Sequence, residues 1–223
     1  MLYAVLSMET KIISHRGRTS RKSTDNTLKS VNDAIRSNAD MVEVDIRRTK
    51  DSQIICFHDA DIDGKLIKDL HYSEIIEISS HIPTLEQVLW SAKDKIEIEI
   101  ELKESDYEEE VISIALDYFD YDKLVLKSFH PRVVKEIKEI NQKICTGLLI
   151  GSAFSLDELF SVINESVTCK NFNQTSADFV SPYYKIFCAG WFFRFSRNKI
   201  PIQVWTVNDE ETIRTLINKQ VHS

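Results

Sequence analysis

The chain has 223 residues, of which 43% are hydrophobic and 28% are charged, and its formal net charge is −7 at pH 7. A chain of this length suits one α/β domain of the larger kind, roughly 200–250 residues, and no Pro/Gly/Ser-rich stretch marks a linker, so we expect a single domain over residues 1–223. The composition excludes a disordered chain, and the negative charge excludes a general nucleic-acid binder, which needs clustered Lys and Arg.

The sequence contains no pattern that places the chain in a membrane. Its first residues (MLYAVLSMETK) include an apolar run too short for a signal peptide, and no later run approaches the roughly 20 apolar residues of a membrane span. The cysteines are far apart and form no CxxC pair, which disfavours a zinc site or a disulfide scaffold: Cys56, Cys145, Cys169 and Cys188. We therefore expect a cytoplasmic protein with reduced cysteines and without a stable membrane anchor.

The first predicted element is a short apolar strand over residues 11–17 (KIISHRG), where Gly17 frees the backbone for a turn. The strand ends in His15. A basic run follows that could draw a small anion although the whole protein is acidic: Arg16, Arg18, Arg21 and Lys22. After a polar loop, residues 25–27 (DNT) predict the cap of a helix that ends near Asn38.

Residues 41–59 (MVEVDIRRTKDSQIICFHD) predict a β-hairpin that carries Glu43, Asp45 and His58. Side chains at i and i+2 leave the same face of a strand, so Glu43 and Asp45 share a pocket. Two close carboxylates stay ionised at little cost only when a cation lies between them, because like charges raise one pKa. The pair therefore predicts a site for a divalent metal ion.

The strand predicted over residues 96–103 (IEIEIELK) alternates strictly between two faces. Apolar residues occupy one face, and the other face carries Glu97, Glu99, Glu101 and Lys103. In isolation, an edge strand with a solvated acidic face explains this pattern as well as a functional site does. The order of the surrounding elements favours the functional site.

Helices and strands alternate along the rest of the chain. Residues 61–80 predict a small excursion and residues 83–92 a helix. The later predicted strands are at residues 124–129, 144–150, 177–181 and 200–207. The later predicted helices are at residues 107–119, 131–141, 156–164 and 209–218. Repeated βα units without a Gly-rich nucleotide fingerprint predict a TIM-type (β/α)8 barrel rather than a doubly wound sheet. Barrel chemistry lies at the C-terminal ends of the strands, where His15, His58 and Glu101 fall.

Short motifs along the chain, taken in order, resemble the glycerophosphodiester phosphodiesterase family, whose members are TIM barrels. Each motif alone is a weak signal, but their common order over about residues 11–218 is a strong one. The motifs are His15-Arg16-Gly17, Asp25-Asn26-Thr27 (Glu-Asn-Thr in the family), residues 39–45 (ADMVEVD), Thr49-Lys50-Asp51, His58-Asp59, Pro83-Thr84-Leu85, Glu101-Leu102-Lys103, Ser128-Phe129 and Trp205-Thr206-Val207-Asn208.

This resemblance implies a metal site and a pair of proton carriers. Glu43, Asp45 and Glu101 would be the metal ligands, and three carboxylates suit a hard cation, Mg²⁺ or Ca²⁺. His15 and His58 would be the general acid and base, since imidazole gains and loses a proton near pH 7.

The resemblance also implies residues for the substrate. Arg16 and Lys103 would neutralise charge on the phosphoryl oxygens. Trp205 would pack against the glycerol or alcohol part of the substrate, with a plain core tryptophan as an equal alternative. The implied reaction is hydrolysis of a glycerophosphodiester, such as glycerophosphocholine or glycerophosphoethanolamine, to sn-glycerol 3-phosphate and an alcohol. Water and the substrate's own hydroxyl are alternative nucleophiles.

The chain departs from the family pattern in three places. Asp25 replaces Glu, a change for which we expect a mild effect. Glu99 stands where relatives often have Asn, and we expect Arg47 to neutralise it, because unpaired buried carboxylates are costly. The chain also lacks the C-terminal eighth strand that closes the family's barrel, so the first and seventh strands would be open edges unless residues 2–6 (LYAVL) supply a substitute.

Two other functions stay open at this point. A related barrel phospholipase, of the C or D type, would use a similar site. A truncated, inactive protein that only binds phosphodiesters would account for the absent strand. The aromatic stretch at residues 191–195 (WFFRF) is interpreted as buried core rather than as a lipid-contacting patch. The head group, the ion, the roles of the two histidines and the oligomeric state are also open.

Overall fold

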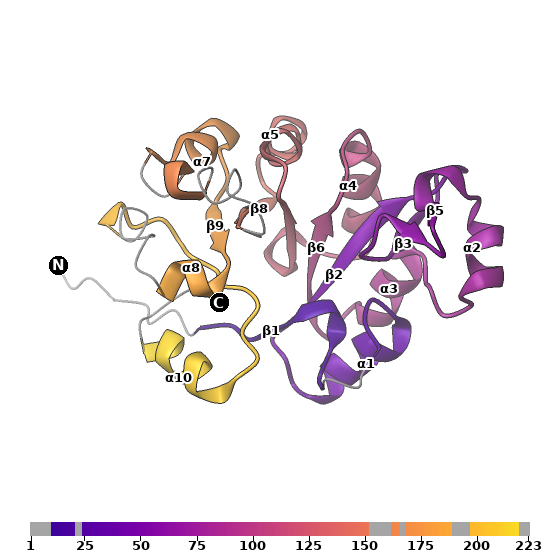
Figure 1. Cartoon of the computed structure of the whole chain (residues 1–223), viewed down its shortest axis with the longest axis horizontal. Helices are drawn as coiled ribbons and strands as arrows, with labels where there is room; N and C mark the ends of the chain where they lie inside the picture. Colours follow the sequence, from indigo (N-terminus) through magenta and orange to yellow (C-terminus); the bar gives the residue numbers. More distant parts are fainter. Residues whose placement is uncertain (1–9, 21–23, 152–161, 166–167, 189–196, 219–223) are drawn as a thin grey trace.

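The computed structural model describes residues 10–20, 24–151, 162–165, 168–188 and 197–218, and it shows a curved parallel sheet with helices along its outer face (Figure 1). The sheet order is β1, β2, β6, β7, β8, β9. These strands span Ile13–Ser14 (β1), Met41–Arg48 (β2), Glu97–Leu102 (β6), Leu124–Ser128 (β7), Cys145–Ile150 (β8) and Phe179–Pro182 (β9). The sheet is thus a barrel that is open along one side.

Helices follow the strands along the chain and cover the outside of the sheet. The predicted cap at residues 25–27 falls on Thr27, whose hydroxyl accepts the Ser30 N–H at 3.1 Å and so begins α1 (Leu28–Arg36). Pro131 begins α5 (Pro131–Ile140), as its missing N–H and fixed φ favour. The other helices are α3 (Leu85–Ala92), α4 (Glu108–Leu116), α7 (Lys170–Thr175), α8 (Tyr184–Cys188) and α10 (Glu210–Asn218).

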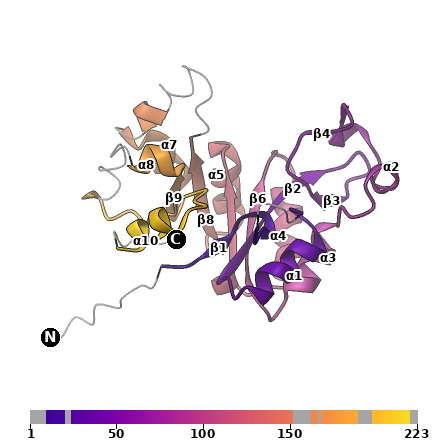
Figure 2. The same cartoon turned by 60° about the horizontal axis from the view of Figure 1, so that its bottom comes forward.

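The excursion predicted over residues 61–80 projects from one end of the main sheet (Figures 1 and 2). It contains the two-stranded sheet of β4 (Asp61–Ile62) and β5 (Lys65–Leu66), the single turn η2 (Ile67–Asp69) and α2 (Tyr72–Ile78). A small apolar cluster of its own anchors it to the barrel: Ile55, Ile67, Leu70, Ile75 and Ile82. Two further single turns are η1 (His15–Gly17) and η3 (Tyr121–Lys123).

The neighbouring strands β2 and β6 carry apolar side chains on one face and acidic side chains on the other. The apolar set packs with the helices and is fully buried: Val42, Val44, Ile46, Ile98, Ile100 and Leu102. Burial of each contributes about 1.5–3 kcal/mol relative to exposure. The parallel register places Glu43 beside Glu99 and Asp45 beside Glu101 on the other face. The apolar layer therefore holds four carboxylates at a fixed spacing inside the barrel.

The predicted hairpin over residues 41–59 needs one correction. β3 (Ile54–Cys56) pairs antiparallel with only the last part of β2, from Ile46 to Arg48. The rest of β2 lies between the parallel neighbours β1 and β6, because its apolar face completes the barrel core. Glu43 and Asp45 thus belong to the barrel interior rather than to an isolated hairpin.

The segment predicted as a strand over residues 200–207 lies beside β9. It pairs through two isolated parallel bridges, Val180 with Ile202 and Tyr183 with Trp205. Backbone hydrogen bonds join the two sides, among them Gln203 N–H to the Val180 carbonyl at 3.0 Å. The described residues contain no strand that joins this segment to β1, in agreement with the expected absence of a closing strand. Residues 2–6, the suggested substitute, and the aromatic stretch at 191–195 lie outside the described residues.

Each described helix is too short or too polar to cross a membrane. The four cysteines are free, as predicted; Cys56 and Cys169 are buried, Cys145 is half-buried and Cys188 is exposed. The cytoplasmic location stays a prediction.

Candidate active site

Three carboxylates meet at the C-terminal half of β2 and β6. One oxygen from each of Glu43, Asp45 and Glu101 lies within 4.8 Å of the others, and all three side chains are buried. Their convergence follows from the two-residue repeat of a strand and from the register that sets Asp45 beside Glu101. The structure therefore brings the three predicted metal ligands together.

The carboxylate cluster has the oxygen donors that a hard divalent cation needs. Glu43 Oε1 is buried and accepts no hydrogen bond from the described residues. Burial, with the nearby charges of Asp45 and Glu43, raises the pKa of Glu101 to about 7, although Lys103 opposes the rise. Oxygen ligands of this kind suit Mg²⁺ or Ca²⁺. The residues present therefore fit such an ion.

Asp45 is the most strongly held member of the cluster. Asn26 Nδ2 donates to Asp45 Oδ2 at 2.8 Å, and Asn26 Oδ1 accepts the Asp45 N–H at 3.0 Å. Burial alone would raise the pKa of Asp45, but Lys103, Arg16 and these hydrogen bonds hold it to about 2. Sequence reasoning interpreted residues 25–27 as a helix cap and as one of the family-like motifs, without a role in the site. It missed Asn26, whose signal was its place in the Asp-Asn-Thr motif beside the cap.

The two predicted phosphate-binding cations also lie at the cluster. Arg16 Nε is 3.1 Å from Asp45 Oδ2, and Lys103 Nζ is 2.7 Å from Asp45 Oδ1 and contacts Glu101 as well. Arg16 has a left-handed backbone, φ 57°, which turns the chain inward after β1. Its guanidinium also lies 3.6 Å from Asp25, the shorter acid that replaces the family's Glu.

The turn after β1 also depends on Gly17, which has φ +71°. A Cβ at this position would lie 2.7 Å from the backbone of Ser30, so only glycine allows the turn to pack against α1. The turn places His15 and Arg16 at the edge of the carboxylate cluster.

The two predicted proton carriers line different hollows. His15 Nε2 is 4.0 Å from Glu43 Oε2. Burial lowers the pKa of His15, and the Glu43 carboxylate partly opposes this effect. His58 follows β3, with Nδ1 2.7 Å from Asp59 Oδ1. It lines a small hollow together with Arg16 and Asp25. His15 thus borders the carboxylate cluster, and His58 lies in the hollow that it shares with Arg16, whose guanidinium contacts Asp45; both rings are partly exposed.

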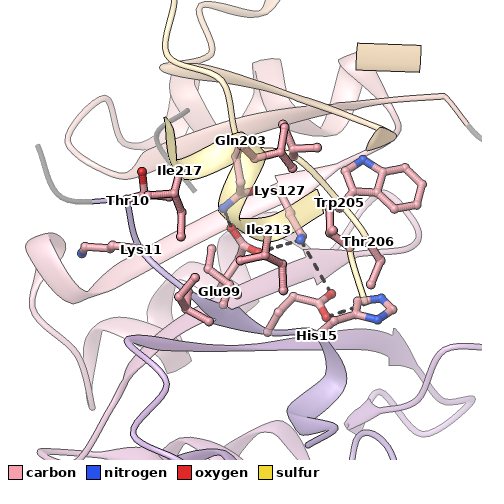
Figure 3. A pocket seen from close by; sticks show the side chains of 16 residues that line it. Thr10, Lys11, His15, Glu99, Lys127, Gln203, Trp205, Thr206, Ile213 and Ile217 are labelled. Atoms are coloured by element: carbon pink, nitrogen blue, oxygen red, sulfur yellow. Dashed lines mark hydrogen bonds and ion pairs between the residues drawn. The ribbon is translucent and has the colours of Figure 1, made fainter. Parts of the chain in front are cut away.

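Trp205 forms an aromatic wall near His15. Its Nε1–H donates to the Ser181 carbonyl at 2.8 Å, and its ring packs edge-on against Phe129 with centroids 5.3 Å apart. Trp205 and His15 line one cavity together (Figure 3). Trp205 is therefore positioned at the site and is not an enclosed core residue, because its surface is only partly buried.

The expected partner of Glu99 was wrong. Arg47 stands nearer the rim of the barrel, where it donates to Glu104 at 2.6 Å and to the His58 carbonyl at 2.9 Å. Glu99 lies one layer below Glu101 and accepts instead from Lys127 Nζ at 2.6 Å and from Gln203 Nε2 at 2.7 Å. Position along the strand decides the pairing. Glu43 is the residue of β2 that lies beside Glu99, and Arg47 lies four residues further along β2.

Lys127 is a buried cation at the floor of the site that sequence reasoning missed. It is 4% exposed, and besides Glu99 it lies 3.9 Å from Glu43 Oε1 (Figure 3). Burial alone would lower the pKa of Lys127, but the carboxylates of Glu99, Glu43 and Glu101 raise it above its ordinary value. The signal was a single lysine within the apolar strand at residues 124–129.

Replacing Lys127 by methionine is expected to lower the free energy of unfolding by about 3–5 kcal/mol, because Glu99 would be left buried without a cation. Urea unfolding measures this loss. The double variant Glu99→Gln, Lys127→Met should regain part of it, since no unpaired charge remains. The exposed Lys135, paired with Glu139, provides a control whose methionine variant should change stability by about 1 kcal/mol or less. Equal losses for Lys127→Met and Lys135→Met would contradict the pairing.

The metal-free protein is expected to lose stability as the pH rises through about 7. The pKa of Glu101 is about 7 in the folded chain against an ordinary 4.5, so folding favours its protonated form. The contribution of Glu101 to the free energy of unfolding is complete below pH 4.5 and is lost as the pH rises through 7. Thermal unfolding in EDTA at several pH values measures it, and Glu101→Gln, which does not titrate, should flatten the dependence. A melting temperature of the parent protein that rises relative to this variant over the same range would contradict the expectation.

Comparisons with known proteins place these features in context. The model of the "Glycerophosphoryl diester phosphodiesterase family" matches residues 15–223. A Bacillus subtilis protein, YhdW, to which glycerophosphodiester phosphodiesterase activity has been ascribed, is 28% identical over 225 residues, covering 92% of this chain and 89% of that protein.

Solved structures share the fold. The glycerophosphodiester phosphodiesterase of Thermotoga maritima is 26% identical with a TM-score of 0.76, covering 96% of this chain and 92% of that one. An Oleispira antarctica phosphodiesterase, solved with the product sn-glycerol-3-phosphate, is 20% identical with a TM-score of 0.80, covering 97% and 92%.

Proposed function

The chain belongs to the glycerophosphoryl diester phosphodiesterase family, and from that premise we propose that it hydrolyses glycerophosphodiesters to sn-glycerol 3-phosphate and an alcohol with the help of one divalent cation. Glycerophosphocholine and glycerophosphoethanolamine are the substrates we expect. The predicted family, the barrel-type fold and the phosphodiesterase class are confirmed by the family model and the solved relatives. The cation, the substrates and the roles of individual residues are our proposal.

The observation that carries this proposal is the buried cluster of Glu43, Asp45 and Glu101. Three carboxylates in so small a space favour a bound cation, and among the described residues Glu43 Oε1 has no hydrogen-bond donor. These three residues would hold Mg²⁺ or Ca²⁺, which when bound polarises the phosphoryl group.

The cationic side chains around the cluster support phosphate as the ligand. Arg16 contacts one carboxylate oxygen of Asp45, and Lys103 contacts the other. Both side chains would also face the phosphoryl oxygens of a bound diester. Positive groups fixed in a buried site stabilise the charge that develops in the transition state. The Oleispira antarctica relative was solved with sn-glycerol-3-phosphate, a phosphate monoester of the class proposed here as product.

His15 and His58 are the proposed proton carriers. One would accept the proton of the attacking hydroxyl, and the other would donate a proton to the leaving alcohol. His58 Nδ1–H would donate a hydrogen bond to Asp59 Oδ1 and so fix the orientation of the ring. When water attacks, the phosphorus–oxygen bond to the alcohol breaks and the water oxygen remains on phosphorus, which gives glycerol 3-phosphate directly. When the substrate's glycerol hydroxyl attacks, the same bond breaks and a cyclic glycerol phosphate forms, which water then opens to glycerol 3-phosphate.

Product analysis with purified protein tests the proposed function. With Mg²⁺ or Ca²⁺ present, glycerophosphocholine should yield sn-glycerol 3-phosphate and choline, and EDTA should stop the reaction. Release of glycerol and phosphocholine would instead indicate cleavage of the phospholipase C type. No product from any of several diesters would favour a binding protein without activity.

A further inference from the structure

Glu43, one of the three carboxylates of the cluster, has a different neighbour at each of its two oxygens. Oε2 accepts the backbone N–H of Arg16 at 2.9 Å. Oε1 lies 3.9 Å from the Lys127 ammonium, and no described residue donates a hydrogen bond to it. Because Glu43 is 1% exposed, bulk water does not take the place of either neighbour. The oxygen that is still open to a cation is therefore the one beside Lys127.

The register of the sheet determines where the Lys127 side chain lies. β7 pairs parallel with β6, and Lys127 is in register with Glu101. Residues in register on neighbouring strands share a face, so Lys127 points into the barrel with the acidic side chains of β2 and β6. With an exposed fraction of 4%, Lys127 is a fixed positive charge in the barrel interior.

The hydrogen bonds of Lys127 leave part of its ammonium group for Glu43. Glu99 Oε2 accepts one hydrogen bond from Lys127 Nζ at 2.6 Å, and an ammonium group has three donors (Figure 3). The other oxygen of Glu99 accepts from Gln203 at 2.7 Å. Among the described residues, Glu43 Oε1 is the second carboxylate oxygen within ion-pair distance of Lys127 Nζ.

A positive charge at this place changes what Glu43 can offer to a metal ion. Charges about 4 Å apart interact strongly where water is excluded. A carboxylate can coordinate an ion through one oxygen or through both. Ca²⁺ takes about six to eight oxygen ligands and accepts both oxygens of a carboxylate, whereas Mg²⁺ requires a strict octahedron and keeps several waters. The loss of one oxygen to Lys127 therefore weakens the binding of Ca²⁺ more than that of Mg²⁺.

We propose that Lys127 is a positioning residue that keeps Glu43 Oε1 away from the ion, so that Glu43 coordinates through one oxygen and the site selects Mg²⁺ over Ca²⁺. The inference rests on the proposed function, which places one divalent cation at the cluster, and it names that cation. The alternative role of Lys127 is that of a structural counter-ion for Glu99. Such a counter-ion would affect the stability of the fold but not the preference between two ions.

The double variant Glu99→Gln, Lys127→Met removes the lysine without leaving Glu99 buried and unpaired. With Oε1 of Glu43 released, the Kd of Ca²⁺ should fall at least about tenfold more than the Kd of Mg²⁺, because Ca²⁺ can use the additional oxygen. Calorimetric titration of EDTA-stripped protein with each ion measures the two constants. An unchanged ratio of the two constants would overturn the inference.

Glu99→Gln alone should move this ratio in the opposite direction. Glutamine keeps the side-chain volume but removes the charge that holds Lys127, so the ammonium is drawn toward Glu43. Both ions should bind more weakly, and the loss should be about threefold greater for Ca²⁺ than for Mg²⁺. The variant retains the lysine and therefore tests the inference even where the double variant does not fold. A ratio that stays the same or shifts toward Ca²⁺ would overturn it.

The double variant Asp178→Asn, Lys138→Met is the matched control. Lys138 is also a buried lysine, 8% exposed, and it pairs with Asp178 at 2.6 Å, but it lies on α5 and outside the carboxylate cluster. Removal of this pair should leave the ratio of the two constants unchanged. Equal shifts in the two double variants would assign the ion preference to a loosened barrel and overturn the role of Lys127.

Activity separates the inference from the proposed function. If the ion preferences shift as predicted but no diester is cleaved, the proposed function fails and the inference stands. If glycerophosphocholine is cleaved but the ratio is the same in the parent protein and in Glu99→Gln, Lys127→Met, the inference fails and the proposed function stands. If neither ion binds the parent protein or the variants, the inference fails together with the proposed cation.

Discussion

Replacing Glu101 by glutamine is expected to abolish Mg²⁺ binding and to lower the rate of diester hydrolysis by roughly three orders of magnitude or more, since a catalytic metal contributes several kcal/mol of transition-state stabilisation. Glutamine keeps the volume of the side chain but removes one of three charges from a buried site. Calorimetric titration with Mg²⁺ measures binding directly, and release of glycerol 3-phosphate measures activity.

Glu97→Gln is the matched control for this variant. Glu97 lies on the same strand and the same face as Glu101, but four residues earlier, where it pairs with Lys11. Its amide variant should keep both Mg²⁺ binding and activity. If Glu97→Gln and Glu101→Gln lose activity together, general charge in the barrel rather than the three-carboxylate cluster controls the reaction.

Replacing either predicted proton carrier by asparagine is expected to lower kcat by about 10²- to 10⁴-fold, the usual contribution of general acid–base catalysis. His15→Asn and His58→Asn should retain Mg²⁺ binding, because neither ring is among the three carboxylate ligands. The combination of lost turnover and retained ion binding separates these residues from Glu101.

His71→Asn is the control for the histidine variants. His71 lies on the excursion, half exposed and 3.7 Å from Asp51, away from the carboxylate cluster. Its variant should turn over like the parent protein. Full activity of His15→Asn would remove this residue from the proposed mechanism, and a shift of the pH–rate profile in only one of the two site variants would identify which histidine titrates during turnover.

The carboxylate cluster was predictable in two steps. Alternation in residues 41–46 and 96–102 specifies which side chains share a face, and burial of the apolar face excludes a one-residue shift of register. This pattern placed Glu43 and Asp45 together, whereas the resemblance to the family added Glu101 as the third ligand. The helix start at Thr27 and the turn at Gly17 follow from equally local chemistry.

Contacts between distant parts of the chain were not predictable in this way. Lys127 and Gln203 come from different segments of the barrel and meet Glu99 only when the sheet curves. Arg47 was predicted to pair with Glu99 because their strands are adjacent. In the structure Arg47 lies further along the barrel axis and pairs with Glu104, and the sequence alone does not provide that position. Asn26 donates a hydrogen bond to Asp45 because the loop before α1 brings the two side chains together, which its position in the helix cap did not indicate.

The most direct test of the account is a titration of EDTA-stripped protein with Mg²⁺, followed in parallel by calorimetry and by release of glycerol 3-phosphate from glycerophosphocholine. We predict one ion per chain, with occupancy and activity rising along the same curve and both lost in Glu101→Gln. Full activity of the stripped protein in EDTA, or activity that rises without occupancy of the Glu43, Asp45 and Glu101 cluster, would contradict the account.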